Sequence, residues 1–261
     1  MNADLKGKCV LITGASGGIG QTTARAFADE GADLVLHYHR NRQAIDRMLG
    51  TLDVRTEAVQ ADLRVEQQAE AMFDKALQAF PKIDVLVVNA ATWDPSPVPL
   101  HQMTAAQWQQ TLDADLTSAF YTCRAFMRHL AASPRESASI VLVGSTAAIF
   151  GEADHADYAA AKAGLAYGLT LSLKNEIVHL APRGRVNCVC PGWTDTPMAA
   201  GQIADPNLVR RATATRPLRV IARPEDVASA ILFFASDALA AHISGAVLPV
   251  AGGMEGRLLH P

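Results

Sequence analysis

The stretch Thr13-Gly14-Ala15-Ser16-Gly17-Gly18-Ile19-Gly20 decides the fold of this chain. It follows an apolar run at residues 9–12 and leads into a segment of helical pattern at residues 20–30. Glycines between a strand and a helix allow a tight turn and a close approach of the backbone to a phosphate. The helix N-terminus adds unpaired N–H groups and the positive end of its dipole. The stretch therefore predicts a pyrophosphate-binding turn, the alternative being a glycine-rich turn that binds nothing.

Short apolar runs recur along the chain and alternate with segments of helical pattern. The runs lie at residues 9–12, 34–36, 56–59, 85–88, 140–143, 186–189 and 247–250. The helical segments lie at residues 20–30, 65–79, 104–130, 158–180 and 224–235. Runs that are apolar on both faces are typical of parallel strands covered by helices on each side. We therefore predict an α/β fold, a Rossmann-type doubly wound sheet of about seven parallel strands with helices on both faces, in one domain over residues 1–261.

The composition excludes several other classes of protein. Of the 261 residues, 49% are hydrophobic and 19% are charged, which excludes a disordered chain. A net charge of -3 without any Lys/Arg run argues against a nucleic-acid binder, and no apolar run reaches the ~18–20 residues of a membrane span. Four scattered cysteines form neither a disulfide framework nor a metal-ligand pattern. We expect a cytoplasmic, metal-free protein that binds neither nucleic acid nor membrane.

The end of the second strand bears on the choice of cofactor. In a dinucleotide-binding fold, an acidic residue there binds the 2′-hydroxyl of NAD, whereas a basic residue suits the 2′-phosphate of NADP. His39 and Arg40 occupy this position, which favours NADP(H) over NAD(H) unless they form an ordinary solvated turn. Asp62, after the third run, could bind an adenine amino group or cap the following helix. The residues alone leave both roles open.

Tyr158 and Lys162 are one helical turn apart, so their side chains project from the same face of the segment 158–180. A tyrosine titrates near ~10, but a cation beside it favours the phenolate and lowers its pKa. Such a pair is a general acid/base suited to moving a proton on or off an oxygen. The spacing by itself also arises by chance in many helices.

Taken in order, these motifs resemble the short-chain dehydrogenase/reductase family over essentially the whole chain, and within it the 3-oxoacyl-ACP reductases and carbonyl reductases. Residues 13–20 are similar to the TGxxxGxG nucleotide motif, and residues 89–91 look like the NNAG turn. Ser145 precedes Tyr158 by thirteen residues, a spacing typical of the family, and residues 158–162 match YxxxK. Residues 191–196 resemble the segment that holds the nicotinamide carboxamide, and residues 243–253 resemble the closing strand.

The resemblance implies an NADP(H)-dependent oxidoreductase that interconverts a ketone and a secondary alcohol by hydride transfer. Tyr158 would exchange a proton with the substrate oxygen, and Ser145 would hydrogen-bond the same oxygen. Lys162 would lower the pKa of Tyr158 and bind the nicotinamide ribose. The cofactor-binding residues that the resemblance implies are Gly14, Ser16, Gly18, Ile19, Gly20, His39, Arg40, Asp62, Leu63, Asn89, Tyr158, Lys162, Pro191, Gly192, Thr194 and Thr196.

Three positions depart from the family pattern. Residues 88–91 lack the first Asn and the final Gly of the turn motif, and Gly17 stands where relatives that prefer NADP often carry a basic residue. Asp115 stands where the family commonly has an Asn that supports a water chain from the lysine to solvent. A negative charge near Lys162 would shift the pKa values of both groups. We expect Asp115 to take part in the proton relay, in rebuilt or weakened form.

Substrate choice should reside in loops beyond the carboxyl ends of the strands. The candidates are residues 92–97, residues 149–155 and a lid-like span at residues 196–216. Trp93, Phe150, Trp193 and Met198 could line an apolar or ring-shaped pocket, or pack the domain or a subunit contact. His155 could contact the substrate, or be a surface residue where the helix begins.

The resemblance ranks a 3-oxoacyl-ACP or broad carbonyl substrate first. Residues 36–41 also resemble pteridine reductases, but those relatives use an Asp where Ser145 stands, so a pterin or sugar substrate ranks below. Residues 104–130 and 156–180 resemble the faces through which the family forms dimers and tetramers, so we expect a homo-oligomer such as a homotetramer. A hypothesis from another class is a catalytically silent dinucleotide-binding regulator, against which the intact Ser145, Tyr158 and Lys162 argue.

Overall fold

A computed structural model describes residues 3–256 of the chain. Seven parallel strands form one sheet in the order β3-β2-β1-β4-β5-β6-β7. The strands are β1 (Cys9–Ile12), β2 (Asp33–Tyr38), β3 (Thr56–Gln60), β4 (Val85–Val88), β5 (Ser139–Val143), β6 (Arg185–Pro191) and β7 (Val247–Val250). All seven overlap the predicted apolar runs. The doubly wound α/β sheet is confirmed, while residues 1–2 and 257–261 of the predicted domain lie outside the described part.

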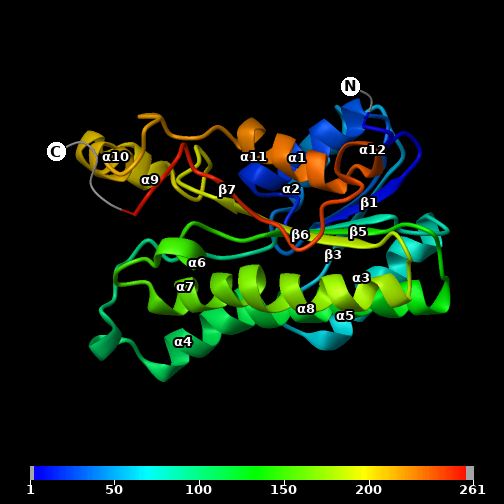
Figure 1. Cartoon of the computed structure of the whole chain (residues 1–261), viewed down its shortest axis with the longest axis horizontal. Helices are drawn as coiled ribbons and strands as arrows, with labels where there is room; N and C mark the ends of the chain where they lie inside the picture. Colours follow the sequence, from blue (N-terminus) through cyan, green and yellow to red (C-terminus); the bar gives the residue numbers. More distant parts are fainter. Residues whose placement is uncertain (1–2, 257–261) are drawn as a thin grey trace.

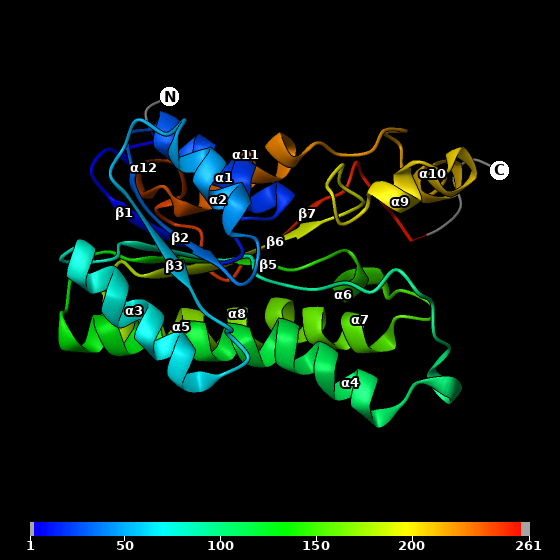
Figure 2. The same ribbon diagram turned by 180° about the vertical axis from the view of Figure 1, so that it is seen from behind.

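Helices cover both faces of the sheet (Figures 1 and 2). On one face lie α1 (Gly18–Asp29), α2 (Arg42–Leu49), α11 (Pro224–Ala235) and α12 (Asp237–Ala240). On the other face lie α3 (Glu66–Ala79), α4 (Ala105–Leu112), α5 (Ser118–Ala132), α7 (Ala156–Ala163) and α8 (Thr170–Glu176). Each face has its own apolar core, with Phe27 and Ile231 in the first and Phe126 and Leu165 in the second, all almost completely buried. Burial on both faces explains why the strands are apolar throughout.

Two predicted helices are not continuous α-helices. The segment 104–130 contains a π-helical turn, η2 (Asp113–Thr117), between α4 and α5. The segment 158–180 contains a second π-helical stretch, η3 (Gly164–Leu169), between α7 and α8, and ends in a 3₁₀ turn, η4 (Ile177–His179). The spacing of apolar residues in the sequence could not reveal these π turns, because each turn shifts the helical pattern by only a single residue.

Several short elements were not predicted individually. They are α2, η1 (Leu100–Gln102), α6 (Ala147–Phe150), α9 (Ala200–Ile203), α10 (Pro206–Thr213) and α12. The lid-like span 196–216 is therefore partly helical, and α9 and α10 lie at one end of the molecule (Figure 1). Three of these helices, α2, α10 and α12, have cap signals that could have located them. The side chains of Asn41, Asp205 and Ser236 accept the N–H groups of Ala44, Asn207 and Leu239.

The strand order reverses between β1 and β4, which are neighbours in the sheet with β2 on the far side of β1. In open α/β sheets such a reversal opens a crevice at the carboxyl ends of the strands. The turn before α1 lies at this point. Within residues 3–256, no helix is both long and apolar enough to cross a membrane.

Candidate active site

The turn between β1 and α1 brings backbone segments closer together than a side chain would permit. Gly14 has a φ of 63°, and a Cβ there would lie 2.8 Å from the Cα of Ala90. A Cβ on Gly20 would overlap the carbonyl oxygen of Gly14. Helix α1 begins without a side-chain cap, which leaves its first N–H groups and its positive dipole end to a ligand. The turn thus fits the pyrophosphate of a dinucleotide.

Two side chains brace this turn. The Asn89 amide donates to the carbonyl oxygens of Thr13 and Gly14 at 3.0 and 3.1 Å. His37 Nδ1 accepts the N–H of Gly14 at 3.0 Å, and its Nε2 lies 3.1 Å from the Ala61 carbonyl oxygen. Burial lowers the pKa of His37 to about 4, so the neutral ring carries its proton on Nε2 and bonds both loops at once. Sequence reasoning missed His37; its only signal was a histidine inside an otherwise apolar strand.

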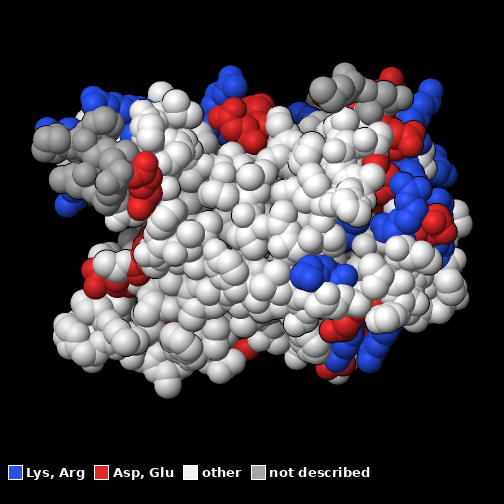
Figure 3. Space-filling view, viewed as in Figure 1, with Lys and Arg blue, Asp and Glu red and all other residues white. Residues whose placement is uncertain are grey.

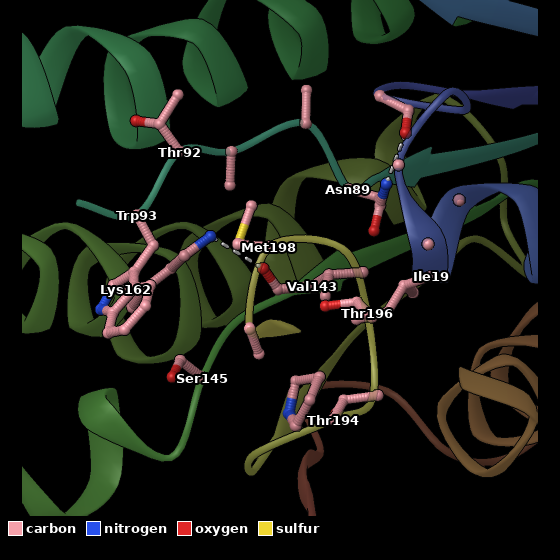
Figure 4. A pocket seen from close by; sticks show the side chains of 18 of the residues that line it. Ile19, Asn89, Thr92, Trp93, Val143, Ser145, Lys162, Thr194, Thr196 and Met198 are labelled. Carbon is pink, nitrogen blue, oxygen red and sulfur yellow. Dashed lines mark hydrogen bonds between the residues drawn. The ribbon is translucent and has the colours of Figure 1, made fainter. Parts of the chain in front are cut away.

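A cavity of about 920 Å³ opens at the carboxyl ends of the strands. Every residue that the sequence implied for cofactor binding lines it, from the glycine turn to Thr196. In Figure 4, Ile19, Asn89 and Thr196 lie at one end, while Lys162, Trp93 and Ser145 lie at the other. This volume is at the upper end of the range for ligand pockets, so a dinucleotide and a small substrate can share it.

The predicted substrate residues divide into two groups. Trp93, Trp193 and Met198 line the cavity. Phe150 and His155 do not line it: Phe150 is 39% exposed, and His155 stacks against the Trp93 ring with the centroids 5.4 Å apart. A role for His155 is therefore indirect, through the orientation of Trp93.

The cavity end near β2 and β3 is basic. Arg40, Arg47 and Arg64 line it together with a single carboxylate, Asp62. The Arg64 guanidinium donates to both oxygens of Asp62, which lowers the pKa of that carboxyl to about 2. The helix-cap alternative for Asp62 is wrong, because α3 has Val65 at its N-cap and no side-chain cap bond. Arg64 instead holds Asp62 ionised at the cavity wall.

Ser145, Tyr158 and Lys162 converge at the other end. Because α7 is helical across the pair, Lys162 Nζ lies 5.5 Å from the centroid of the Tyr158 ring, and it donates to the Val143 carbonyl oxygen at 3.4 Å. Ser145 lies two residues after the end of β5, and its hydroxyl is close enough to the Tyr158 phenol to favour the phenolate. The Ser145 Oγ also accepts the N–H of Ala147 at 3.1 Å, so it meets the start of α6 as well as facing Tyr158.

The pKa of Tyr158 lies above its usual value. Burial is the largest cause, and the negative charge of Asp115 adds to it, while Lys162 and Ser145 act in the opposite direction. Lys162 lowers the pKa of Tyr158, as predicted, but burial has the larger effect. Desolvation of the phenolate outweighs the neighbouring cation.

Asp115 lies behind Lys162 rather than in the cavity. Its Oδ1 accepts the backbone N–H and the hydroxyl of Thr92 at 2.8 and 3.2 Å, and its Oδ2 is 3.5 Å from Lys162 Nζ. Both side chains are almost completely buried. Burial raises the pKa of Asp115, whereas the carboxylate raises the pKa of Lys162. The lysine is therefore held as a cation under the Tyr158 ring.

Comparisons with known proteins agree with this arrangement. A family model described as enoyl-(acyl carrier protein) reductase matches residues 14–255. The chain is 38% identical to a cis-4-hydroxycyclohexanecarboxylate dehydrogenase of Sinomonas cyclohexanicum, over 94% of this chain and 96% of the relative. It is 35% identical to a 3beta-hydroxysteroid dehydrogenase of Eggerthella lenta, over 97% and 96%. It is 34% identical to a 3-oxoacyl-[acyl-carrier-protein] reductase of Chlamydia pneumoniae, over 97% and 99%.

A solved structure gives the same result. The crystal structure of a short-chain dehydrogenase/reductase from Brucella melitensis, described as a glucose/ribitol dehydrogenase, matches with a TM-score of 0.88 and 32% identity, over 98% of this chain and 99% of that one. The fold is thus that of the short-chain dehydrogenases/reductases. The chain belongs to the short-chain dehydrogenase/reductase family. It is an oxidoreductase for alcohol and ketone groups, using NAD(H) or NADP(H) as its family does. This argues against the alternative hypothesis of a catalytically silent dinucleotide-binding regulator.

Proposed function

We propose that this chain interconverts a ketone and a secondary alcohol with NADP(H), using Tyr158 as the general acid/base. The observation that carries the proposal is the convergence of Ser145, Tyr158 and Lys162 at one end of a cavity whose other end is a phosphate-binding turn. When bound, the nicotinamide cofactor supplies the hydride chemistry. Tyr158 exchanges the proton of the substrate oxygen, and Ser145 orients that oxygen. Lys162 stabilises the phenolate, and Asp115 keeps Lys162 charged and links it to the proton path.

Replacement of Tyr158 by Phe tests the acid/base role. The phenol oxygen disappears while the ring and the cavity wall remain, so kcat for ketone reduction should fall by about 10²–10⁴-fold. The Kd for NADPH, measured by fluorescence titration, should change less than about threefold. Turnover of the Tyr158→Phe variant close to that of the wild type would refute the assignment.

The preference for NADP(H) rests on the basic cavity end. Arg40 is exposed there and can bind a 2′-phosphate with its planar fork, and Arg64 neutralises the nearby Asp62. Hydrogen bonds to charged groups contribute about 1.5–3 kcal/mol. The Arg40→Ala variant should therefore raise the KM for NADPH about 10–100-fold and leave the KM for NADH nearly unchanged.

Arg25→Ala is the matched control, because Arg25 is exposed on α1 and does not line the cavity. It removes the same charge and should alter neither KM. If the wild type turns over NADH better than NADPH, or if Arg40→Ala affects both cofactors equally, the proposed preference is wrong.

For the substrate, we propose a carbonyl compound, with the 3-oxoacyl-ACP and broad carbonyl classes first. The names of the relatives support this order, since they include a 3-oxoacyl-[acyl-carrier-protein] reductase and two dehydrogenases of cyclic alcohols. A sugar or pterin ranks second; the description of the Brucella melitensis protein as a glucose/ribitol dehydrogenase favours a sugar. An NADPH-oxidation screen over β-ketoacyl thioesters, cyclic ketones, sugars and pterins decides between them.

A further inference from the structure

Glu152 places a carboxylate in the cavity at the reacting end. It lines the cavity together with Trp93, Ser145 and Tyr158, and only 28% of its side chain is exposed. It was not among the residues singled out from the sequence. It lies in the segment 149–155, which the sequence predicts as a substrate loop, but only Phe150 and His155 were named there. A half-buried carboxylate needs hydrogen-bond donors or a positive charge beside it, and a bound substrate can supply them.

The surroundings of Glu152 hold its carboxylate in place. His155 Nδ1 lies 3.8 Å from the Glu152 Oε1. Burial raises the pKa of the Glu152 carboxyl, and the neighbouring His155 and Trp93 side chains oppose that rise. His155 is itself oriented, with Nε2 3.0 Å from the Asp94 carbonyl oxygen and its ring stacked on Trp93. The loop that carries Glu152 is also tied to the loop after Trp93, because the Asp154 carbonyl accepts the N–H of Val98 at 2.9 Å. The stacked Trp93 and His155 side chains thus lie beside Glu152 and help to hold its carboxylate at the cavity wall.

The charge of Glu152 reaches the reacting group. Its carboxylate is close enough to Tyr158 to raise the pKa of the phenol. The negative charge of Glu152 also acts on any substrate group that lies between Glu152 and Tyr158. A hydroxyl or ammonium group can donate to the carboxylate, whereas a substrate carboxylate would meet a like charge in a partly desolvated site.

Building on the proposed function, we propose that Glu152 determines specificity: it selects neutral hydroxylated or cationic amino ketones and disfavours substrates that carry a carboxylate near the carbonyl. This separates the chain from the Sinomonas relative, whose name specifies a hydroxycyclohexanecarboxylate. The opposite preference would require a cation. Lys162 is paired with Asp115, and Arg40, Arg47 and Arg64 lie at the cavity end near β2 and β3. The further cations that line the cavity are Arg211 and Arg216. Arg216 already donates to the carbonyl oxygens of Ala212 and Val220.

Three cyclic ketones that differ in one substituent test the proposal. They are 4-hydroxycyclohexanone, 4-oxocyclohexanecarboxamide and 4-oxocyclohexanecarboxylate. For each, kcat/KM with NADPH and Kd in the presence of NADP⁺ are measured, the latter by tryptophan fluorescence. The wild type should favour the carboxamide over the carboxylate by about tenfold, equivalent to ~1.4 kcal/mol of discrimination. Glu152→Gln keeps the shape and loses the charge, so this ratio should approach one.

Asp154→Asn is the matched control. Asp154 is exposed in the same loop, does not line the cavity, and has a φ of 65°, which asparagine tolerates. This variant should keep the tenfold ratio. Four outcomes would overturn the proposal. The wild type could prefer the carboxylate, or it could fail to bind 4-hydroxycyclohexanone. The carboxamide-to-carboxylate ratio could stay unchanged in Glu152→Gln, or it could fall as far in Asp154→Asn as in Glu152→Gln. If the ketones bind but no NADPH is oxidised, the proposed function fails, and the Kd ratio still decides the role of Glu152.

Discussion

At the scale of single residues, the buried pair of Asp115 and Lys162 distinguishes this site. An asparagine at position 115 would leave Lys162 as an uncompensated cation beneath the Tyr158 ring. The carboxylate here balances that charge, and its field raises the pKa of both Tyr158 and Lys162. The pair therefore makes Tyr158 a weaker acid than the lysine alone would make it.

This predicts the pH dependence of the Asp115→Asn variant. Alcohol oxidation requires the phenolate, so the rate rises with pH through the pKa of Tyr158. Removal of the carboxylate lowers that pKa, and the rising limb of kcat/KM for oxidation should move to lower pH. The decline of ketone reduction with increasing pH should move in the same direction, because the phenol loses its proton earlier.

The measurement is a pair of pH–rate profiles for each variant. Asp113→Asn provides the control, since it removes a charge from the same π turn at a residue whose side chain contacts Gln109 and Thr117. Its profile should overlay that of the wild type. A shift of Asp115→Asn to higher pH would contradict the role given to the carboxylate.

At the scale of elements, two π-helical segments meet beside the site. Asp115 and Leu116 belong to η2, and Lys162 lies two residues before Gly164, the first residue of η3. A Cβ on Gly164 would lie 2.9 Å from a methyl carbon of Leu116. The missing side chain at Gly164 therefore allows the approach that brings Asp115 to Lys162.

Gly164→Ala should accordingly destabilise the protein by about 1–3 kcal/mol through overpacking. Gly168→Ala in the same π segment meets nothing within 4 Å, so it should be neutral or stabilise by ~0.5–1 kcal/mol, as expected for Gly→Ala in a helix. Urea unfolding of the two variants measures the difference. If the two variants had equal free energies of unfolding, the close contact between Gly164 and Leu116 would not contribute to stability as proposed.

At the scale of the whole molecule, the helical layer that contains α5, η3 and α8 exposes large apolar side chains. They are Phe120, Tyr167, Leu171 and Val178, each between 38% and 48% exposed. The part of this layer that faces the viewer in Figure 3 carries few charged side chains. Apolar surface without charges is typical of protein–protein contacts. We propose that this face pairs two copies of the chain, as expected for a homodimer or homotetramer.

Sedimentation velocity tests this proposal. The wild type should sediment as a dimer or tetramer, and Leu171→Glu should shift the mass towards the monomer, because a charge would be buried at the contact. Leu218→Glu, at an exposed leucine outside this layer, should leave the mass unchanged. A monomeric wild type at micromolar concentration would contradict the proposed pairing.

The sequence by itself determined the sheet, the glycine turn and the positions of Ser145, Tyr158 and Lys162. These features depend on short-range patterns: apolar runs buried on both faces, a turn that only glycine permits, and a spacing of one helical turn. The residues that share the cavity could be predicted because the carboxyl ends of parallel strands meet at one edge of the sheet.

Only the tertiary structure decided how distant residues act on that site. His37 bonds the glycine turn to Ala61, Arg64 binds Asp62, and Thr92 and Lys162 share Asp115. Glu152 likewise meets Trp93, which comes from another loop, only at the wall of the folded cavity. The net direction of the Tyr158 pKa could not be predicted for the same reason. Burial and long-range charge depend on the packed chain, and no local pattern in the sequence records them.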